Sequence, residues 1–500
     1  MIYFILIFWF LIFIKLLFFW LWIWQLKEYH IGRFLAHFET QAAKKILSSF
    51  WRLKYPKFTK KIIVISFTSV LLAALLSFFL SASLVLFFIV LAPLIFSLIV
   101  LIFQIPTLIW RKRLLKKARE KRQSFKNLLV IGITGSYGKS STKEFLATIL
   151  SEKYKVLKTK KNQNSEVGIS QCILNDLKPE HEIFVCEMGA YNRGGIKLLC
   201  DIARPKIGIL TGISEQHMST FGSQENIIKT KYELIESLPQ DGLAILNGDN
   251  DYCYELFKKT INSKRIYSSQ PTIANFPTDI YTSSVAVNRE FLSFKVLDKS
   301  GESAIFKVSL SGGHNVLNIL AAVCCARELG MTLEEIALAS QKIESWQSGM
   351  QLKKGINGLN IIDATYSANP DGVLSHLEYL KIWPGKRIII MPCLIELGDA
   401  TIEVHKRIGE KIGEICDLSI ITTRERFQEI GEGAIEKGMK GENILFIENP
   451  KEIFEKVRSF CRESEEDKSS SSPFAVARKG DVILLESRVP KEVIESLSLC

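Results

Sequence analysis

The sequence contains no CxxC pair, although ten cysteines are scattered along its 500 residues. Structural zinc sites need cysteine or histidine ligands at close spacings, so the cysteine pattern argues against such a site. We expect the cysteines to be reduced, partly buried thiols, as in cytoplasmic domains. The sequence also has no internal repeat. Its length is sufficient for two to four domains, each with a core of its own.

Acidic residues are scarce in the first quarter of the chain. Residues 1–127 contain three of them, Glu28, Glu39 and Glu120, against 19 lysines and arginines, which gives a net charge of +16. Residues 128–500 contain 45 basic and 49 acidic residues, a net charge of −4. The overall charge of +12 is therefore a property of the N-terminal quarter and does not indicate a nucleic-acid partner. The remainder has the charge balance of a slightly acidic soluble enzyme.

Charged residues are almost absent from two N-terminal runs. Residues 2–24 are apolar except for Lys15, and residues 62–103 form 42 nearly uncharged positions, enough for two membrane spans of about 20 residues each. The first run has no basic start and no small-residue cleavage site, which argues against a cleaved signal peptide. For the later pair the alternative is buried helices of a globular domain. We expect a membrane module at residues 1–110 with three helices, at about residues 2–24, 62–81 and 84–110.

Basic residues flank these runs and predict a topology. The loop 25–61 carries nine lysines and arginines, and residues 111–126 carry nine more. Such segments remain on the cytoplasmic side, where anionic lipids attract them. We therefore expect three spans, an outside N-terminus, a location in the inner (plasma) membrane, and residues 128–500 in the cytoplasm.

The stretch "GITGSYGKSSTKEF" (132–145) resembles a phosphate loop that lacks its usual first glycine, whose place is taken by Ile133. A Val- and Ile-rich strand pattern precedes it and a helical pattern follows. Gly135 and Gly138 free the backbone between them, so that amides and the positive end of the helix can face an anion. Lys139 would hold the β- and γ-phosphates, and the hydroxyl of Ser140 would hold Mg²⁺. The alternative is an ordinary glycine-rich turn.

Downstream, short apolar strands alternate with helical segments, as in a parallel α/β sheet. Polar residues follow the strands "IFVC", "IGILTGI" and "LAIL" at the sheet edge where ligands bind. A carboxylate beside a phosphate loop is a natural Mg²⁺ ligand. Taken singly, each of these residues can also be read as a solvated strand end. The residues are Glu187, His217, Asn247, Asp249 and Asp251.

Together these motifs resemble the Mur ligases, the ATP-dependent amide ligases of peptidoglycan precursor synthesis. The resemblance runs from about Leu128 to the C-terminus and is closest to the branch that adds D-alanyl-D-alanine to a UDP-N-acetylmuramoyl-tripeptide. The matching stretches are "TGSYGKS" (134–140), "NQNSEVGI" (162–169), "EMGA" (187–190), "EQHMSTFGSQENIIKTKYEL" (215–234), "GGHNVLNILAA" (312–322), "DATYSANPDG" (363–372) and "IELGD" (395–399) with His405.

The resemblance implies an α/β fold with two domains after the membrane module. A basic linker at 111–127 would lead to an ATP-binding, parallel-sheet central domain at 128–345 and a Rossmann-like ligase domain at 346–500. The implied reaction joins D-alanyl-D-alanine to a UDP-linked or lipid-linked peptide through an acyl phosphate, with release of ADP. One alternative is a membrane-bound amide ligase for another polymer, such as poly-glutamate. A further alternative is a binding or regulatory protein that retains a nucleotide fold.

The resemblance also implies roles for single residues. Lys139, Lys231 and His217 would be catalytic. Two Mg²⁺ ions would be held by Ser140, Glu187, His217 and Lys231, with Lys231 carbamylated so that it carries a negative charge. Without the motif, Lys231 reads as a helical surface lysine. Asn369 would close over the nucleotide from the C-terminal domain. The residues expected to bind ATP are Gly135, Ser136, Gly138, Lys139, Ser140, Ser141, Asn315, Asn318 and Asp363.

Several positions depart from the family pattern. Ala364 replaces one acid of an Asp-Asp pair, Ser165 replaces an asparagine, and Glu486 stands where a lysine is common. The usual arginine near residues 348–352 is missing. We expect the membrane module to stand in place of the family's domain that grips the UDP end of the substrate. The expected partners are the peptide substrate, D-alanyl-D-alanine and the membrane, with no nucleic acid.

Overall fold

The computed structural model describes residues 2–26, 29, 54–79, 82–160, 163–216, 218–274, 276–355, 358–366, 369–462 and 480–498. The chain divides into two compact units, Met1–Leu114 and Leu115–Cys500. The predicted catalytic residue His217 lies outside the described residues.

The first unit consists of apolar helices around a small core. They are α1 (Ile2–Leu26), α4 (Lys60–Phe79) and α5 (Ala82–Ile102), followed by the start of α6 (Ile105–Ser124). Among the described residues, one helical stretch, Leu91–Ser124, is long and apolar enough to cross a membrane, and Phe10–Leu26 is a shorter apolar helix. The three-span membrane module therefore stays a prediction.

Tryptophans on α1 anchor α5 through one hydroxyl. The indole nitrogens of Trp20 and Trp24 donate to Ser97 Oγ at 2.8 and 3.0 Å, and Ser97 Oγ donates to the carbonyl of Pro93 at 2.8 Å. Indole N–H groups in an apolar environment need such partners, so Ser97 fixes how α1 and α5 pack. Buried side chains from all three helices form the core of this unit: Phe13, Leu17, Leu21, Ile23, Ile62, Ile65, Phe96 and Val100.

Helix α6 differs from the sequence-based expectation. The sequence predicts a third helix at 84–110 and a linker at 111–127. In the structure, α5 ends at Ile102, a turn follows, and α6 continues through most of the predicted linker to Ser124. Lysine and arginine are good helix formers, so a basic composition does not prevent a helix here. The second half of α6 also has a buried face, where Leu115 and Ala118 join the core of the second unit.

A buried arginine ties this end of α6 to the second unit. The guanidinium of Arg122 donates to the carbonyls of Ala203, Phe125 and Leu128 at 2.9, 2.8 and 3.0 Å. A buried guanidinium is tolerated because each of these bonds satisfies it. The C-terminal half of α6 is thus a structural part of the second unit.

The central domain is built on a nine-stranded sheet of order β11-β10-β9-β6-β5-β4-β1-β3-β2. Neighbours from β2 to β9 run parallel, and β9, β10 and β11 form an antiparallel extension. The strands are β1 (Leu129–Thr134), β2 (Val156–Lys158), β3 (Ile183–Glu187), β4 (Ile207–Leu210), β5 (Leu243–Asn247), β6 (Ser263–Ser268), β9 (Ile280–Val287), β10 (Leu292–Asp298) and β11 (Ser303–Val308). A short hairpin, β7 (Thr272–Ile273) and β8 (Phe276–Pro277), lies outside this sheet.

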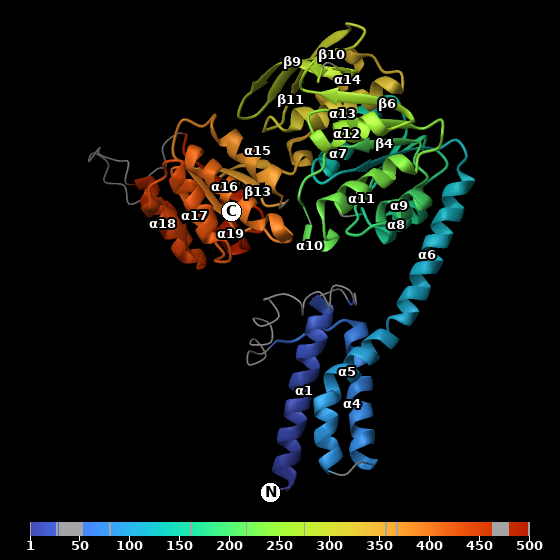
Figure 1. The fold of residues 1–500 in the computed structure, drawn as a ribbon, viewed down its shortest axis with the longest axis vertical. Coiled ribbons are helices and arrows are strands. Elements are labelled where there is room, and N and C mark those ends of the chain that lie inside the picture. The colour runs from blue at the N-terminus through green and yellow to red at the C-terminus, as the bar shows by residue number, and fades with distance from the viewer. Residues whose placement is uncertain are drawn as a thin grey trace. The chain divides into compact units, whose positions relative to one another are not determined.

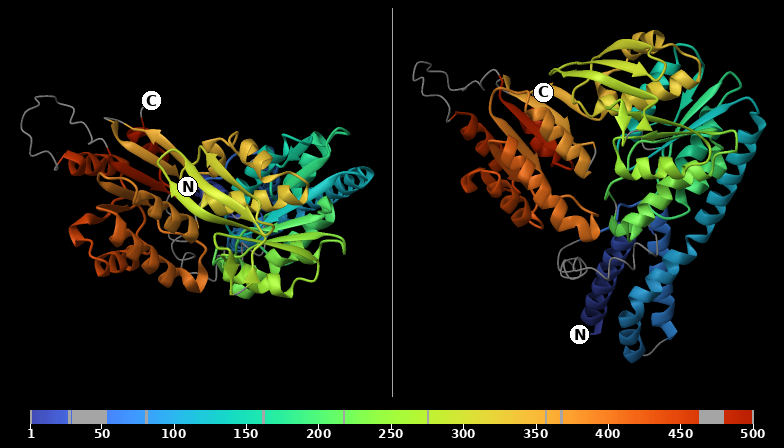
Figure 2. Two further views of the ribbon diagram at one scale, coloured as in Figure 1. Left: turned by 90° about the horizontal axis from the view of Figure 1, so that it is seen from above. Right: turned by 45° about the horizontal axis from the view of Figure 1, so that its top comes forward.

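Helices cover both faces of this sheet (Figures 1 and 2). One face carries α7 (Lys139–Leu150), α13 (Asn315–Glu328) and α14 (Leu333–Ser340). The other face carries α8 (Glu166–Asp176), α9 (Gly195–Ala203), α11 (Gln224–Glu236) and α12 (Asp251–Lys259), and α10 (Met218–Phe221) adds Phe221 to the same core. The parallel strands read as continuous apolar runs because both of their faces are buried.

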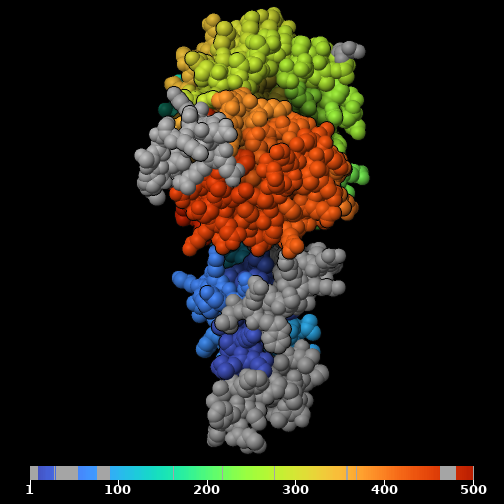
Figure 3. Space-filling model, turned by 90° about the vertical axis from the view of Figure 1, so that its left-hand side faces the viewer, coloured from blue at the N-terminus to red at the C-terminus, as the bar shows by residue number. Residues whose placement is uncertain are grey.

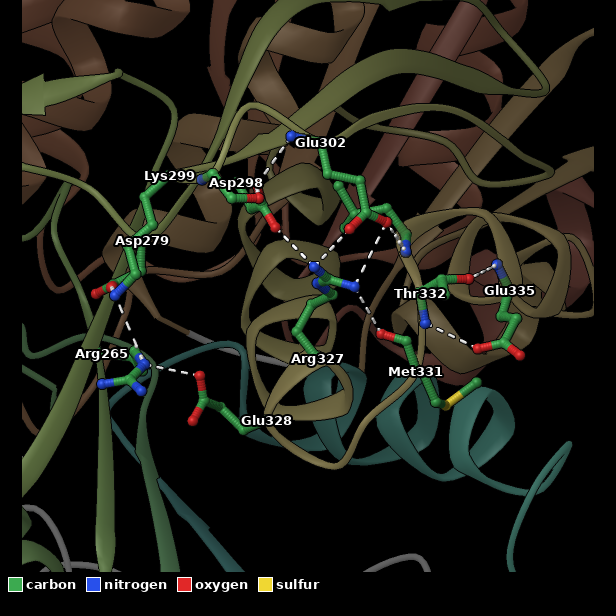
Figure 4. A network of polar contacts seen from close by, with 12 residues as sticks. Arg265, Asp279, Asp298, Lys299, Glu302, Arg327, Glu328, Met331, Thr332 and Glu335 are labelled. Atoms are coloured by element: carbon green, nitrogen blue, oxygen red, sulfur yellow. Dashed lines mark hydrogen bonds and ion pairs between the residues drawn. The ribbon is translucent and has the colours of Figure 1, made fainter.

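A polar network fastens the antiparallel extension to the helices (Figure 4). Arg327 on α13 pairs with Asp298 on β10 at 2.7 Å and with Glu302 at 2.6 Å. Arg265 on β6 pairs with Glu328 at 2.7 Å. These contacts position the N-terminal end of α13, where two predicted site residues lie, by fixing the other end of the helix.

The C-terminal domain has a second sheet of order β12-β13-β17-β14-β15-β16, parallel except for β12. Helices α15 to α17 cover one face and α18 and α19 the other. Figure 3 shows one side of this domain, in orange and red. The strands are β12 (Gln351–Lys354), β13 (Asn360–Ala364), β14 (Arg387–Met391), β15 (Leu418–Ile421), β16 (Ile444–Phe446) and β17 (Val482–Glu486). The helices are α15 (Pro370–Leu380), α16 (Thr401–Ile415), α17 (Phe427–Glu436), α18 (Pro450–Arg462) and α19 (Lys491–Leu497). The predicted α/β class is confirmed for both domains.

Candidate active site

The phosphate-loop stretch forms a tight turn between β1 and α7. Gly135 has φ +155° and Gly138 has φ +75°. A Cβ on Gly135 would lie 2.1 Å from Thr211 Oγ1, and a Cβ on Gly138 would lie 2.4 Å from Asn318 Oδ1. The left-handed backbone at Gly138 and both close approaches therefore require glycine at these two positions.

The segment after β4 braces this loop. Ser136 N–H donates to the carbonyl of Gly212 at 2.7 Å, and Ser214 N–H donates to Ser136 Oγ at 3.1 Å. The ring of Tyr137 lies on Gly212, where a Cβ would come within 2.3 Å of the ring. The carboxyl ends of β1 and β4 are thus joined through their loops, as expected at the ligand edge of a parallel sheet.

Lys139 begins α7 and turns back over the loop. Its Nζ donates to the carbonyls of Gly135 at 2.6 Å and Ser136 at 3.1 Å. Burial lowers the pKa of this ammonium, and the charge of Glu187 opposes that shift. The ammonium lies where a loop-bound phosphate would need a counter-charge.

The two serines after Lys139 face different surroundings. Ser140 is half-buried in the first turn of α7. Ser141 is buried, and its hydroxyl donates at 3.2 Å to the carbonyl of Ser348, in the short helix Ser345–Ser348. The structure therefore gives Ser141 a partner in the segment that leads to the C-terminal domain.

The predicted asparagines lie on α13 beside the phosphate loop. Asn318 is buried against Gly138, and its Nδ2 donates to Asn315 Oδ1 at 3.3 Å. Asn315 Nδ2 donates to the carbonyl of Ser311 at 2.9 Å. Asn318 therefore contacts the loop, and its hydrogen bond to Asn315 fixes the orientation of its side chain.

Glu187 ends β3 as a buried carboxylate with two protein partners. Asn164 Nδ2 donates to its Oε1 at 3.1 Å, and Lys143 Nζ donates to its Oε2 at 3.3 Å. Lys143 is also within 3.1 Å of Glu144 Oε1. Sequence reasoning missed Lys143 and Asn164, although the motif "NQNSEVGI" contains Asn164. Lys143 follows Lys139 by one helical turn, which is the signal that could have indicated it.

Lys231 is not a surface lysine. It is buried on α11, and its Nζ lies 5.8 Å from the centre of the Phe221 ring. Burial and the charge of Lys139 lower the pKa of Lys231 to about 7. Within the described ranges no carboxylate lies at ion-pair distance from it. Lys231 is distant from the phosphate loop in the sequence, but the fold brings its amine close enough for the charge of Lys139 to act on it.

The predicted metal ligands are only partly assembled. The described part of the chain contains no group of three His, Cys, Asp and Glu side chains that could hold a metal ion. Glu187 is a hard oxygen donor whose charge reaches Lys139, and Ser140 adds a hydroxyl beside the same loop, so these two residues fit Mg²⁺ in kind. His217 lies outside the described residues.

The predicted C-terminal residues have local partners. Asp363 accepts hydrogen bonds from Lys353 Nζ at 2.5 Å and from Thr365 Oγ1 at 2.7 Å. Burial alone would raise the pKa of Asp363, but these hydrogen bonds outweigh it and the pKa lies below its usual value. Asn369 caps α15 by accepting from Gly372 N–H at 2.8 Å. Both residues therefore stabilise their own domain.

Two departures from the family pattern have structural partners here. Ser165 caps α8 by accepting from Gly168 N–H at 3.3 Å. Glu486 is buried, and its Oε2 lies 2.7 Å from His376 Nδ1. His405, which the family resemblance includes together with "IELGD", is buried as a single neutral tautomer. Its Nε2 accepts from Leu394 N–H, and its Nδ1 donates to the carbonyl of Thr401.

Comparison with known proteins agrees with this geometry. The family model of the Mur ligase middle domain matches residues 133–326, and that of the Mur ligase glutamate ligase domain matches residues 350–467. A Synechocystis protein named UDP-N-acetylmuramoyl-tripeptide–D-alanyl-D-alanine ligase is 33% identical over 298 residues, which cover 58% of this chain and 60% of that protein. A Bacillus subtilis protein of the same name is 28% identical over 379 residues, covering 73% and 76%.

Solved structures share the fold. The MurF ligase from Thermotoga maritima, in complex with ADP, superimposes with a TM-score of 0.61 and 28% identity over 77% of this chain and 83% of that one. MurF from Acinetobacter baumannii superimposes with a TM-score of 0.65 and 23% identity, covering 76% and 78%, a likeness of fold. Both matched domains, their order and the loop motif agree, and the chain belongs to the Mur ligase family.

Proposed function

We propose that this protein is an ATP-dependent, ADP-forming ligase that joins D-alanyl-D-alanine to a UDP-N-acetylmuramoyl-tripeptide or its lipid-linked equivalent. The observation that carries the proposal is the meeting of three distant motifs at one loop. Asn318 contacts Gly138, and the charges of Lys231 and Glu187 both reach Lys139. The names of the Synechocystis and Bacillus subtilis relatives support the choice of amine over the poly-glutamate alternative.

The reaction requires that two anions approach each other. A peptide carboxylate attacks the γ-phosphate and gives an acyl phosphate and ADP, and the amine then attacks the acyl carbon and releases phosphate. Catalysis of this kind is mainly positioning and charge stabilisation. Lys139 supplies a cation at the loop, and the loop amides supply further donors.

Mg²⁺ would be held by Ser140 and Glu187, with His217 and a carbamylated Lys231 as the further ligands that the family resemblance implies. Bound there, Mg²⁺ neutralises phosphate charge. Carbamylation of Lys231 is supported by its burial and by the lack of an ion-pair partner in the described part of the chain. With Mg²⁺ bound, Glu187 would either lose its hydrogen bond from Lys143 or keep Lys143 beside it as a second counter-ion.

We further propose that the first unit anchors the enzyme in the plasma membrane, with residues 128–500 on the cytoplasmic side. The stretch Leu91–Ser124 supports one span, and the apolar α1 and α4 support two more. The same proposal includes the domain boundaries: the membrane module ends at residue 110, the linker at residue 127 and the central domain at residue 345. A membrane anchor is compatible with a lipid-linked as well as a UDP-linked substrate.

The test is product identification by mass spectrometry. The detergent-solubilised full chain is incubated with ATP, Mg²⁺, D-alanyl-D-alanine and UDP-N-acetylmuramoyl-tripeptide, and the lipid-linked tripeptide is tested in parallel. We expect the pentapeptide product from one or both, and none from Lys139→Ala, because this ammonium faces phosphate. Equal turnover by wild type and Lys139→Ala would rule out the phosphate-loop assignment.

A further inference from the structure

A row of four alternating charges leads from the phosphate loop to the surface of the central domain. Glu187 on β3 pairs with Lys143 on α7, Lys143 also pairs with Glu144, and Glu144 pairs with Lys158 on β2. The exposed fraction of the side chain is 6% for Glu187 and 2% for Lys143, and it rises to 37% for Lys158. Lys143 is therefore a buried cation shared between two carboxylates.

The ammonium of Lys143 lies almost equally far from its two acids. Its Nζ is 3.3 Å from Glu187 Oε2 and 3.1 Å from Glu144 Oε1. Because both distances are those of an ion pair, the ammonium can shift from one carboxylate to the other while the backbone of α7 stays in place. Glu144 is itself held by Lys158, so a carboxylate is already positioned to receive Lys143.

The two oxygens of Glu187 are held by different groups. Asn164 Nδ2 donates to Oε1 at 3.1 Å, and the backbone N–H of Glu187 donates to Thr159 Oγ1 at 3.0 Å. These two bonds fix one carboxylate oxygen and the backbone without any help from Lys143. Oε2, which Lys143 holds, is thus the oxygen whose partner can be exchanged, and a carboxylate oxygen suits a hard divalent cation.

Two protein cations already compensate Glu187. Lys143 contacts it, and the charge of Glu187 also reaches Lys139 in the phosphate loop. A bare divalent cation that approaches Glu187 is repelled by both ammonium groups, and it must displace Lys143 from Oε2. The phosphates of a nucleotide reverse this balance, because they neutralise Lys139 and themselves bind the cation.

We propose that Lys143 is the resident counter-ion of Glu187 and that it moves to Glu144 when Mg²⁺ binds together with the nucleotide. Lys143 is then a positioning residue that keeps Glu187 from binding a divalent cation in the absence of ATP. This inference rests on the proposed function, in which Glu187 binds the Mg²⁺ that accompanies ATP. It adds the second turn of α7 to the residues that control the metal.

The first test measures the binding of a bare divalent cation to the nucleotide-free full chain in detergent. The probe is Mn²⁺, which takes the same oxygen ligands as Mg²⁺ and whose free concentration is read by electron paramagnetic resonance. In Lys143→Met we expect Mn²⁺ to bind roughly tenfold or more tightly than in the wild type, because a nearby positive charge is removed. In the double variant Lys143→Met/Glu187→Gln this gain should be lost.

Lys160→Met is the matched control. Lys160 is an exposed lysine that pairs with Asp176 at 3.0 Å, so this variant removes the same charge elsewhere in the domain. Its affinity for Mn²⁺ should equal that of the wild type. Wild-type affinity in Lys143→Met, or a gain that persists in the double variant, overturns the proposal, because Lys143 then does not keep cations away from Glu187.

Glu144→Gln changes the same contact in the opposite direction. Lys143 loses the acid that receives it and stays with Glu187, so Mg²⁺ should bind less readily. At a fixed ATP concentration we expect the Mg²⁺ concentration for half-maximal phosphate release to rise roughly threefold to tenfold. Thermal unfolding in detergent identifies a misfolded variant. If Lys143→Met does not fold, Glu144→Gln decides alone, and an unchanged half-maximal Mg²⁺ concentration overturns the proposal.

The two proposals fail in different ways. If the wild type forms no product with D-alanyl-D-alanine, the proposed function is wrong, whereas the Mn²⁺ measurements need neither ATP nor the amine. If the wild type is active and Lys143→Met binds Mn²⁺ no better than Lys160→Met, the function stands and only the role of Lys143 is excluded.

Discussion

Single residues decide the chemistry of this site, and Lys231 is the clearest case. A protonated ammonium does not add CO₂, whereas a neutral amine does. With a pKa of about 7, half of the Lys231 side chains are neutral near pH 7, against fewer than about one in a thousand for an ordinary lysine. Burial thus raises the share of Lys231 side chains in the neutral form, which is the form that can add CO₂.

We expect Lys231→Ala to be nearly inactive and partly rescued by a small carboxylic acid in the buffer. Wild-type activity should fall when dissolved CO₂ is stripped, and return with bicarbonate. Because the lowered pKa leaves the amine mostly protonated below pH 7, recovery at one fixed concentration of dissolved CO₂ should be slower at pH 6 than at pH 8. Steady-state phosphate release measures each effect. Lys229→Ala is the control, since Lys229 is exposed and pairs with Glu225. Full activity of Lys231→Ala would remove the carbamate from the account.

Among the elements of the second unit, the C-terminal half of α6 is held to its neighbours by a buried arginine. Arg122→Ala would remove the guanidinium donor from the carbonyls of Ala203 and Leu128, whereas the carbonyl of Phe125 keeps the N–H of Leu128 at 3.3 Å. Unsatisfied buried groups cost about 1–3 kcal/mol each, so we expect a loss of roughly 2 kcal/mol or more in the free energy of unfolding.

The measurement is urea unfolding of the full chain in detergent, followed by fluorescence. Lys116→Ala is the matched control on the same helix, because Lys116 is exposed and changes at such sites stay within about 0.5 kcal/mol. An Arg122→Ala midpoint equal to that of Lys116→Ala would show that the buried hydrogen bonds do not stabilise the C-terminal half of α6.

The elements also show how far sequence reasoning extends. The turn from β1 to α7 was predictable because strand, glycines and helix are local in sequence. The partners of Glu187 were only partly predictable: the spacing places Lys143 one helical turn after Lys139, but periodicity does not say that Lys143 turns toward β3. Helix α6 was missed because a basic run was read as a linker, although its buried positions Leu115 and Ala118 are three residues apart.

At the scale of the whole molecule, the account predicts which parts of the chain face the cytoplasm. The basic loop 25–61 and the basic end of α6 should both lie there, because lysines and arginines bias insertion. Reporter fusions placed after residue 45 and after residue 120 should both report the cytoplasm. A fusion at residue 81, between the second and third predicted spans, is the matched control and should report the outside. An external signal from residue 45 or 120 contradicts the three-span topology.

The central claim concerns the amine that the enzyme joins to the peptide. The most direct measurement is ADP formation by the detergent-solubilised full chain with ATP, Mg²⁺ and UDP-N-acetylmuramoyl-tripeptide, with D-alanyl-D-alanine and L-glutamate compared side by side. The account predicts ADP formation that depends on D-alanyl-D-alanine and background rates with L-glutamate. Turnover with L-glutamate and background with D-alanyl-D-alanine would contradict it.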